Sequence, residues 1–159
     1  MKLQLTFKNI VDSPHCVIRM NNQELYRGGV PADFLNNFEQ LESDCVLIIE
    51  HINKQPSDTI VKDGTIIRDR SFELDQIVID GYDLEELKWT SEFRAQDGAV
   101  YASCLFFGPN GEFVLKFSNP VLRWLLKTRH EKNNNDPHWE EDYNYYQQAC
   151  KTLQQISPQ

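Results

Sequence analysis

A chain of 159 residues with a net charge of −8 is long enough for one folded domain that buries roughly two-thirds of its unfolded surface. The acidic balance argues against nucleic acid as a partner, because that affinity comes mainly from neutralising phosphates. No apolar run approaches the ~20 residues of a membrane span, and the first ten residues alternate like a strand instead of forming the apolar block of a signal peptide. We therefore expect neither a nucleic-acid nor a membrane partner.

The four cysteines are widely spaced, and each lies in an apolar stretch. No CxxC pair is present, which removes the commonest zinc and redox spacing. Such cysteines are typical of buried free thiols rather than of disulfides. They are Cys16, Cys45, Cys104 and Cys150.

The N-terminal third predicts strands broken by one helix or turn. Residues 2–10 alternate apolar and polar side chains, as a half-buried strand does. Residues 15–20 and 23–27 flank two asparagines that tolerate positive φ, which indicates a hairpin. Residues 32–41 carry apolar side chains at helical spacing and predict a short helix or turn across one sheet edge, whereas the very apolar residues 45–52 predict a central strand.

The middle of the chain predicts a further hairpin and a bulged strand. Asp63-Gly64 lies between two β-branched runs, a strong signal for a hairpin turn. In residues 72–79 the apolar side chains change from one face of the strand to the other. A β-bulge near Asp75-Gln76 would reconcile the two halves.

Residues 104–117 give the clearest pattern of the chain. Two apolar runs flank the turn residues 108–111, and Phe113, Leu115 and Phe117 share one strand face. We predict a central antiparallel hairpin here.

The C-terminal part predicts two helices that cover the β-body of residues 1–118. Asn119-Pro120 is a helix-start pair for a short amphipathic helix. A second helix begins near residue 136 and carries a regular apolar stripe, which we expect to pack against the body or against another subunit. The stripe contains Trp139, Tyr143, Tyr146, Cys150 and Leu153. The predicted fold class is mainly β: one domain, an antiparallel β-sandwich with two C-terminal α-helices in residues 119–159.

No catalytic motif is present: neither GxSxG, a P-loop, GxGxxG nor a cysteine nucleophile with partners. No pair of carboxylates stands out, so no catalytic residue is assigned.

One cluster of residue types that bind metals occurs near the C-terminus, and helix capping also explains it; its members are His130, His138, Glu140, Glu141 and Asp142. Aspartates recur through the middle of the chain and permit a structural Ca²⁺, although none has EF-hand spacing. These are Asp58, Asp63, Asp69, Asp75, Asp80 and Asp83. We expect no other cofactor.

An aromatic segment with interleaved acidic residues offers the best candidate binding surface. Flat rings beside carboxylates can stack on sugars or contact a partner loop, and the same rings can equally belong to the core. The candidate ligand-binding residues are Tyr82, Trp89 and Tyr101. If Trp89 is fully shielded, this prediction fails.

The predicted hairpins resemble jelly-roll β-sandwiches of the carbohydrate-binding-module type. Residues 58–84, DTIVKDGTIIRDRSFELDQIVIDGYDL, and residues 106–117 also resemble small proteins of large tailed phages, including marine ones. The resemblance implies a non-enzymatic binding or assembly protein, a virion component or accessory protein, that recognises a glycan or a protein partner and permits a homo-oligomer. It places the chain in the host cytoplasm or the virion. Two alternatives stay open: a hydrolase with an unidentified acidic pair, and an acidic protein that blocks a basic host target.

Overall fold

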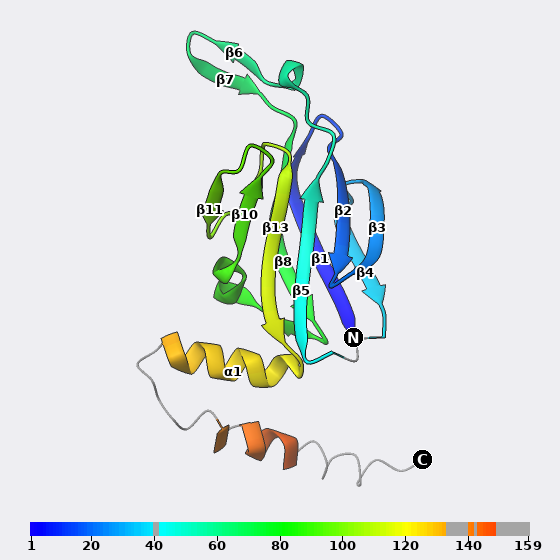
Figure 1. Cartoon of the computed structure of the whole chain (residues 1–159), viewed down its shortest axis with the longest axis vertical. Coiled ribbons are helices and arrows are strands. Elements are labelled where there is room, and N and C mark those ends of the chain that lie inside the picture. Colours follow the sequence, from blue (N-terminus) through cyan, green and yellow to red (C-terminus); the bar gives the residue numbers. More distant parts are fainter. Residues whose placement is uncertain (40–41, 133–139, 142, 149–159) are drawn as a thin grey trace.

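The computed structural model describes residues 1–39, 42–132, 140–141 and 143–148. Within these residues the chain is mainly β. Two antiparallel sheets lie face to face, and two helical segments follow towards the C-terminus (Figure 1). The predicted antiparallel β-sandwich with two C-terminal helices is confirmed.

Sheet A has the strand order β12-β8-β1-β4, with β9 beside β8. The alternating side chains Leu3, Leu5 and Phe7 of β1 are all buried, as predicted. The register between β1 and β8 shifts at one point: Thr6 lies opposite Gln76 and Phe7 opposite Leu74. The predicted bulge near Asp75-Gln76 is therefore confirmed. The strands are β1 (Lys2–Val11), β4 (Asp33–Asn37), β8 (Ser71–Ile79), β9 (Tyr82–Asp83) and β12 (Phe106–Phe107).

Sheet B has the order β11-β10-β13-β5-β2-β3. The apolar strand β5 lies between β13 and β2, which confirms its predicted central position. Strands β2 and β3 form the predicted hairpin, with Asn21 at a φ of 52° in the turn. The strands are β2 (His15–Met20), β3 (Gln23–Gly29), β5 (Asp44–His51), β10 (Glu92–Ala95), β11 (Val100–Ala102) and β13 (Gly111–Ser118).

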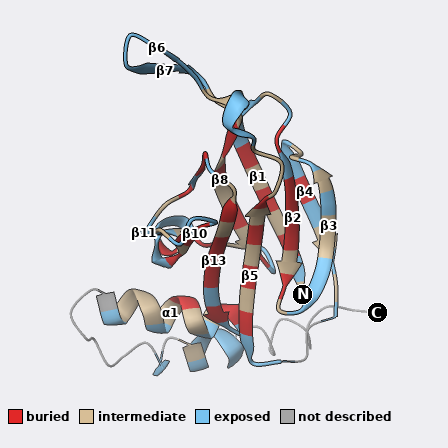
Figure 2. Cartoon of the chain, turned by 45° about the horizontal axis from the view of Figure 1, so that its top comes forward, coloured by how far each residue is buried: buried red, intermediate tan, exposed pale blue. Residues whose placement is uncertain are grey.

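The core lies between the sheets, and Figure 2 shows that the buried residues are concentrated on the strands of the sandwich. A group of phenylalanines joins the two layers. Phe107 of sheet A stacks on Phe72 with ring centroids 4.3 Å apart, and it contacts Phe93 and Phe113 of sheet B at 5.4 and 6.0 Å. Both predicted thiols of the sandwich interior, Cys16 and Cys45, are buried and free. Cys104 is half-buried, and Cys150 lies outside the described residues.

The prediction of a central hairpin in residues 104–117 is wrong. Strand β12 pairs with β8 in sheet A, whereas β13 pairs with β10 and β5 in sheet B. The turn between β12 and β13 therefore crosses from one sheet to the other. The physical reason lies at Phe107: pairing of β12 with β8 places its ring between the layers, where it is fully buried against Phe72 of sheet A and Phe93 and Phe113 of sheet B.

The predicted short helix or turn over residues 32–41 is also wrong. Strand β4 occupies this region and pairs with β1, with Lys2 opposite Asn37 and Thr6 opposite Asp33. Phe34 is buried and its neighbour Leu35 is exposed, which is the alternation of a strand rather than the face of a helix. Pairing with the edge of β1 has overridden the local helical spacing. Residues 40–41 lie outside the described part.

Helix α1 (Val121–Lys132) crosses one end of the sandwich and directly follows Asn119-Pro120, as predicted (Figure 1). Val121 and Leu125 are buried against the body. Residues 140–141 and 143–148 are also helical. Tyr146 of the predicted stripe is 52% exposed, so in the single chain its ring is not buried against the body. Packing of the stripe against another subunit stays a prediction. Trp139, Cys150 and Leu153 lie outside the described residues.

At the opposite end, a hairpin projects from the sandwich (Figure 1). It consists of β6 (Ile60–Lys62) and β7 (Thr65–Arg68), and it forms its own two-stranded sheet. The hairpin predicted around Asp63-Gly64 is confirmed, with both turn residues at positive φ. The short 3₁₀ helix η1 (Pro56–Asp58) precedes it, and a second one, η2 (Glu85–Thr90), follows β9.

Candidate functional site

The three predicted site residues do not form one cluster. Trp89 in η2 is 46% exposed and Tyr101 in β11 is 50% exposed, so neither ring is a core residue. The Ser103 hydroxyl donates a 2.7 Å hydrogen bond to the Trp89 carbonyl oxygen, which holds η2 beside the end of β11. Tyr82 lies instead in β9 of sheet A and packs partly against the core. Ligand binding by these residues stays a prediction.

Strand β11 is the outermost strand of sheet B and leaves one edge open. The Ala95 amide donates to the Ala99 carbonyl, and the Ser103 amide donates to the Ser91 carbonyl. Because hydrogen-bonded positions alternate in an antiparallel pair, the backbone groups of Val100 and Ala102 point away from β10. Within the described residues, no strand pairs with that outer edge.

Both faces of β11 present apolar side chains. Tyr101 lies opposite the buried Phe93 and therefore shares its face, whereas Val100 lies opposite Arg94 on the other face. All three residues of β11 are exposed. An exposed edge without charged side chains is a template for pairing with another strand.

The opposite edge of the sandwich is closed. The rings of Tyr26 in β3 and Phe34 in β4 are in contact, with centroids 5.7 Å apart. The side-chain amide of Asn36 donates a hydrogen bond to the Leu25 carbonyl oxygen across the same edge. Strand β3 also carries a Glu24–Arg27 ion pair of 2.7 Å. Charged side chains of this kind protect an edge strand from further pairing.

The hairpin β6–β7, which we call the arm, exposes aliphatic side chains on both faces. Every residue of the two strands is exposed. Val61 and Ile66 form a cross-strand pair on one face, and Ile60 lies opposite Arg68 on the other. The exposed fractions of the four aliphatic residues run from 43% to 60%; they are Ile60, Val61, Ile66 and Ile67.

Ion pairs hold the base of the arm, which we call the neck. Arg68 donates to both carboxylate oxygens of Asp12, and this guanidinium keeps the pKa of Asp12 below its usual range. Arg70 forms a 3.0 Å ion pair with Asp58. Lys54 pairs with Asp69, which also accepts a 2.7 Å hydrogen bond from Thr59. The arm is therefore anchored by charges and carries its apolar side chains into solvent.

Sequence reasoning found the hairpin but missed its exposure. Aliphatic residues on both faces of a strand usually indicate burial within a sheet. The signal that could have corrected this is the polar run 53–58 before β6 together with the Arg68–Arg70 stretch after β7, since both separate the hairpin from the apolar strands of the body.

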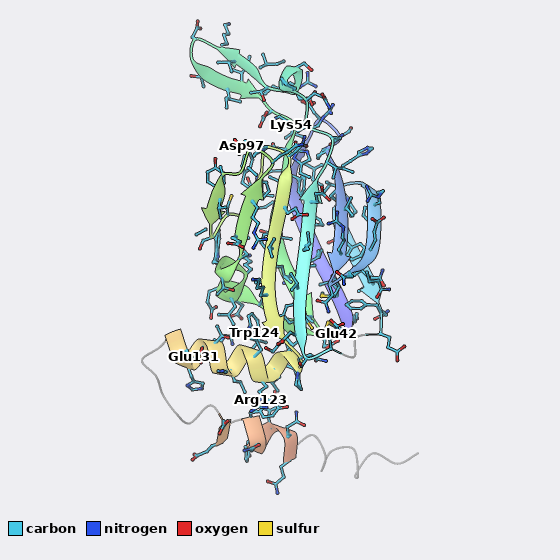
Figure 3. All side chains as sticks on the ribbon, in the orientation of Figure 1. Glu42, Lys54, Asp97, Arg123, Trp124 and Glu131 are labelled. Atoms are coloured by element: carbon cyan, nitrogen blue, oxygen red, sulfur yellow. The ribbon has the colours of Figure 1, made fainter. Side chains whose placement is uncertain are left out.

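A hollow of about 510 Å³ lies at the other end of the sandwich, beside α1. Trp124 and Arg123 line it, and Figure 3 shows them far from Lys54 and Asp97 at the arm end. The basic residues of α1 are ion-paired: Arg123 pairs with Glu140, Lys127 pairs with Glu131, and Arg129 contacts both Glu85 and Glu86.

Two carboxylates face each other on the outer side of sheet B. Glu50 and Glu112 are direct cross-strand neighbours. Arg19 pairs with Glu50 and reaches Glu112 at 3.4 Å. The positive charge of the shared guanidinium offsets the repulsion between the two carboxylates. We therefore interpret this cluster as structural.

The recurring aspartates serve mainly as partners of protein donors. Asp75 pairs with Lys8 at 2.7 Å, the Asp80 carboxylate accepts from the Lys2 amide, and Asp83 accepts from Gln76. Asp58 and Asp69 belong to the neck. Among the described residues, no group of three or more His, Cys, Asp or Glu side chains is arranged to hold a metal. His138 and Asp142 of the predicted C-terminal cluster lie outside that part.

His51 is the buried titratable group of the interior. Its Nδ1 lies 3.1 Å from the Pro109 carbonyl oxygen, and its ring meets Phe72 edge to face at 5.2 Å. Nε2 is buried without a hydrogen-bond partner among the described residues. Burial lowers the pKa of His51, and the nearby cations Lys54 and Arg70 lower it further. The ring is therefore neutral at neutral pH.

No described helix has the length and apolar composition needed to cross a membrane. Comparison of the chain with protein-family models, with curated proteins and with solved structures found no match.

Proposed function

We propose that this chain is a non-enzymatic binding or assembly protein that associates with a protein partner through the arm. The observation that carries the proposal is the exposure of four aliphatic side chains on a hairpin that contributes nothing to the core. A two-stranded hairpin alone is marginally stable in water. Burial of a Val or Ile side chain stabilises a complex by roughly 1.5 to 3 kcal/mol when it is complete.

The ion pairs of the neck support the same function. They fix the base of the arm to the body through Asp12, Asp58 and Asp69. A preorganised binding segment loses less conformational entropy when it associates. The arm thus has two properties of a docking element, an apolar surface and a base anchored to the body by ion pairs.

Photo-crosslinking tests the proposal. A photoreactive phenylalanine analogue at Thr65 on the arm should give one discrete adduct in cells that express the protein. The same analogue at Gln23, an exposed position of β3, is the matched control and should give none. Equal adduct patterns from both positions, or no adduct from position 65, would overturn the proposal.

Glycan recognition through Trp89 and Tyr101 is the second candidate, because both rings are about half exposed. Rings in this state can stack on a sugar. Trp89→Ala should then weaken binding on a glycan array about tenfold or more, whereas Tyr145→Ala, which removes another exposed ring, should not. Equal binding by the two variants would exclude this candidate.

A further inference from the structure

We propose that the partner of the arm is a second copy of this chain, and that the arm of one copy binds along the outer edge of β11 in the other. This inference rests on the proposed function and names its partner. It joins two unsatisfied surfaces of one molecule, an apolar hairpin and an unprotected sheet edge.

The two surfaces match in backbone and in side chains. Strand β6 pairs with β7 alone, so each arm strand has an outer edge without a neighbour in the described chain. The outer edge of β11 likewise has no neighbouring strand there. Addition of an arm strand to β11 would satisfy backbone groups on both sides, which is the recognition mode of strand addition.

The apolar faces also correspond. An added strand lies with one face beside Tyr101 and the other beside Val100. The arm has aliphatic side chains on both faces, so each face of β11 receives an apolar neighbour. A hairpin with a single apolar face would leave one side of this edge in water.

Charge favours the same arrangement. The chain as a whole is acidic, with a net charge of −8, whereas the arm carries the cation Lys62 beside its turn; its other cation, Arg68, is already paired with Asp12. Lys62 has no ion-pair partner among the described residues, and neither has Asp97, in the turn that leads into β11. Complementary charges of this kind fix the register of an interface.

The opposite edge of the sandwich is a poorer acceptor. It is closed by the contact of Tyr26 with Phe34, and β3 is protected by the Glu24–Arg27 pair. The contact between arm and β11 is heterologous, because two different surfaces of the chain meet. If two copies exchange arms reciprocally, such contacts give a dimer. If each copy binds the next, they give a closed ring or an open filament.

Two variants with opposite defects test the pairing by complementation. Ile66→Asp places a charge on the arm, and Tyr101→Lys places a cation on the edge; both positions are exposed, so the fold should survive. Leu35→Asp, at an equally exposed position of β4, is the matched control. Sedimentation velocity over about 1 to 300 µM measures self-association, which rises with protein concentration by mass action.

Wild type and Leu35→Asp should associate, and each of the other two variants should remain near the 18.6 kDa of one chain. An equimolar mixture of Ile66→Asp with Tyr101→Lys should form a species of two chains and nothing larger, because only one intact arm and one intact edge can meet. If the circular dichroism spectrum shows that a variant has lost its fold, Val61→Asp replaces Ile66→Asp on the arm and Val100→Lys replaces Tyr101→Lys on the edge.

Three results would overturn the inference. A wild type that stays monomeric over the whole range excludes a second copy. A Tyr101→Lys variant that associates like wild type excludes the β11 edge and indicates contact between arms. A mixture that forms no two-chain species excludes the pairing. If wild type is monomeric while position 65 crosslinks to a different protein, the proposed function stands and only the inference fails.

Discussion

Phe107→Ala should be among the most destabilising single substitutions in this protein. The Phe107 ring is fully buried, lies in sheet A and contacts Phe93 and Phe113 of sheet B as well as its own neighbour Phe72. Truncation of a buried phenylalanine to alanine costs about 3 to 5 kcal/mol. Aromatic pairs add roughly 0.5 to 1.5 kcal/mol beyond the buried area. The measured cost of truncation already includes such contacts, so with three of them we expect a loss in the upper part of that range, about 4 to 5 kcal/mol.

The adjacent residue provides the matched control. Phe106 has the same side chain in the same two-residue strand, but it is 46% exposed. Phe106→Ala should cost about 1 kcal/mol, because less apolar area is lost from the core. Urea denaturation followed by tryptophan fluorescence measures both variants, and the slope with denaturant should stay constant. If Phe107→Ala costs no more than Phe106→Ala, then β12 does not join the two sheets as described.

Three further predictions concern single positions. His51→Phe should reduce the loss of stability on acidification. The pKa of His51 is lower in the folded state than in the unfolded chain, so the unfolded chain takes up the proton first. The free energy of unfolding of the wild type therefore falls as the pH drops below about 6.5. Chemical denaturation at pH 7 and pH 5 would show this as a smaller difference for the variant; an unchanged difference would exclude His51 as its source. Tyr146→Ala should cost less than about 1 kcal/mol, since the ring is largely exposed, and a loss of about 3 kcal/mol would show that the ring is buried. In a Cys150→Ser background, iodoacetamide should alkylate the half-buried Cys104 before Cys16, because burial raises the pKa of the Cys16 thiol to about 12; mass spectrometry of partly labelled protein checks the order, and early labelling of Cys16 would contradict its burial.

Sequence periodicity predicted elements well where one face of a strand is buried. Leu3, Leu5 and Phe7 alternate in β1, and the parity change in β8 coincides with the observed bulge. The local pattern did not predict which distant strands pair with one another. The turn before β13 has the residues of a hairpin turn, and the same residues can also form a crossing between two sheets. Which of the two forms depends on the long-range contacts of the Phe107 ring.

The candidate surfaces show the same division. The sequence left open whether Trp89 and Tyr101 belong to the core or to a binding surface, and in the structure both rings are about half exposed. It did not indicate that β11 lies at an open edge, because the position of a strand in its sheet depends on the long-range pairing of β10 with β13. The arm was missed as a surface because β-branched residues have the same local signature in a projecting hairpin and in a buried one.

The separation of the arm from the core has an evolutionary consequence. Residues 60–68 contribute no side chain to the buried cluster, so substitutions there escape the packing constraint that acts on residues such as Phe72. If the arm docks on a partner as proposed, selection acts on the arm through that contact. Among descendants of this chain, the arm sequence should diverge in step with the surface it meets, while the length of the hairpin and the charged residues of the neck are retained.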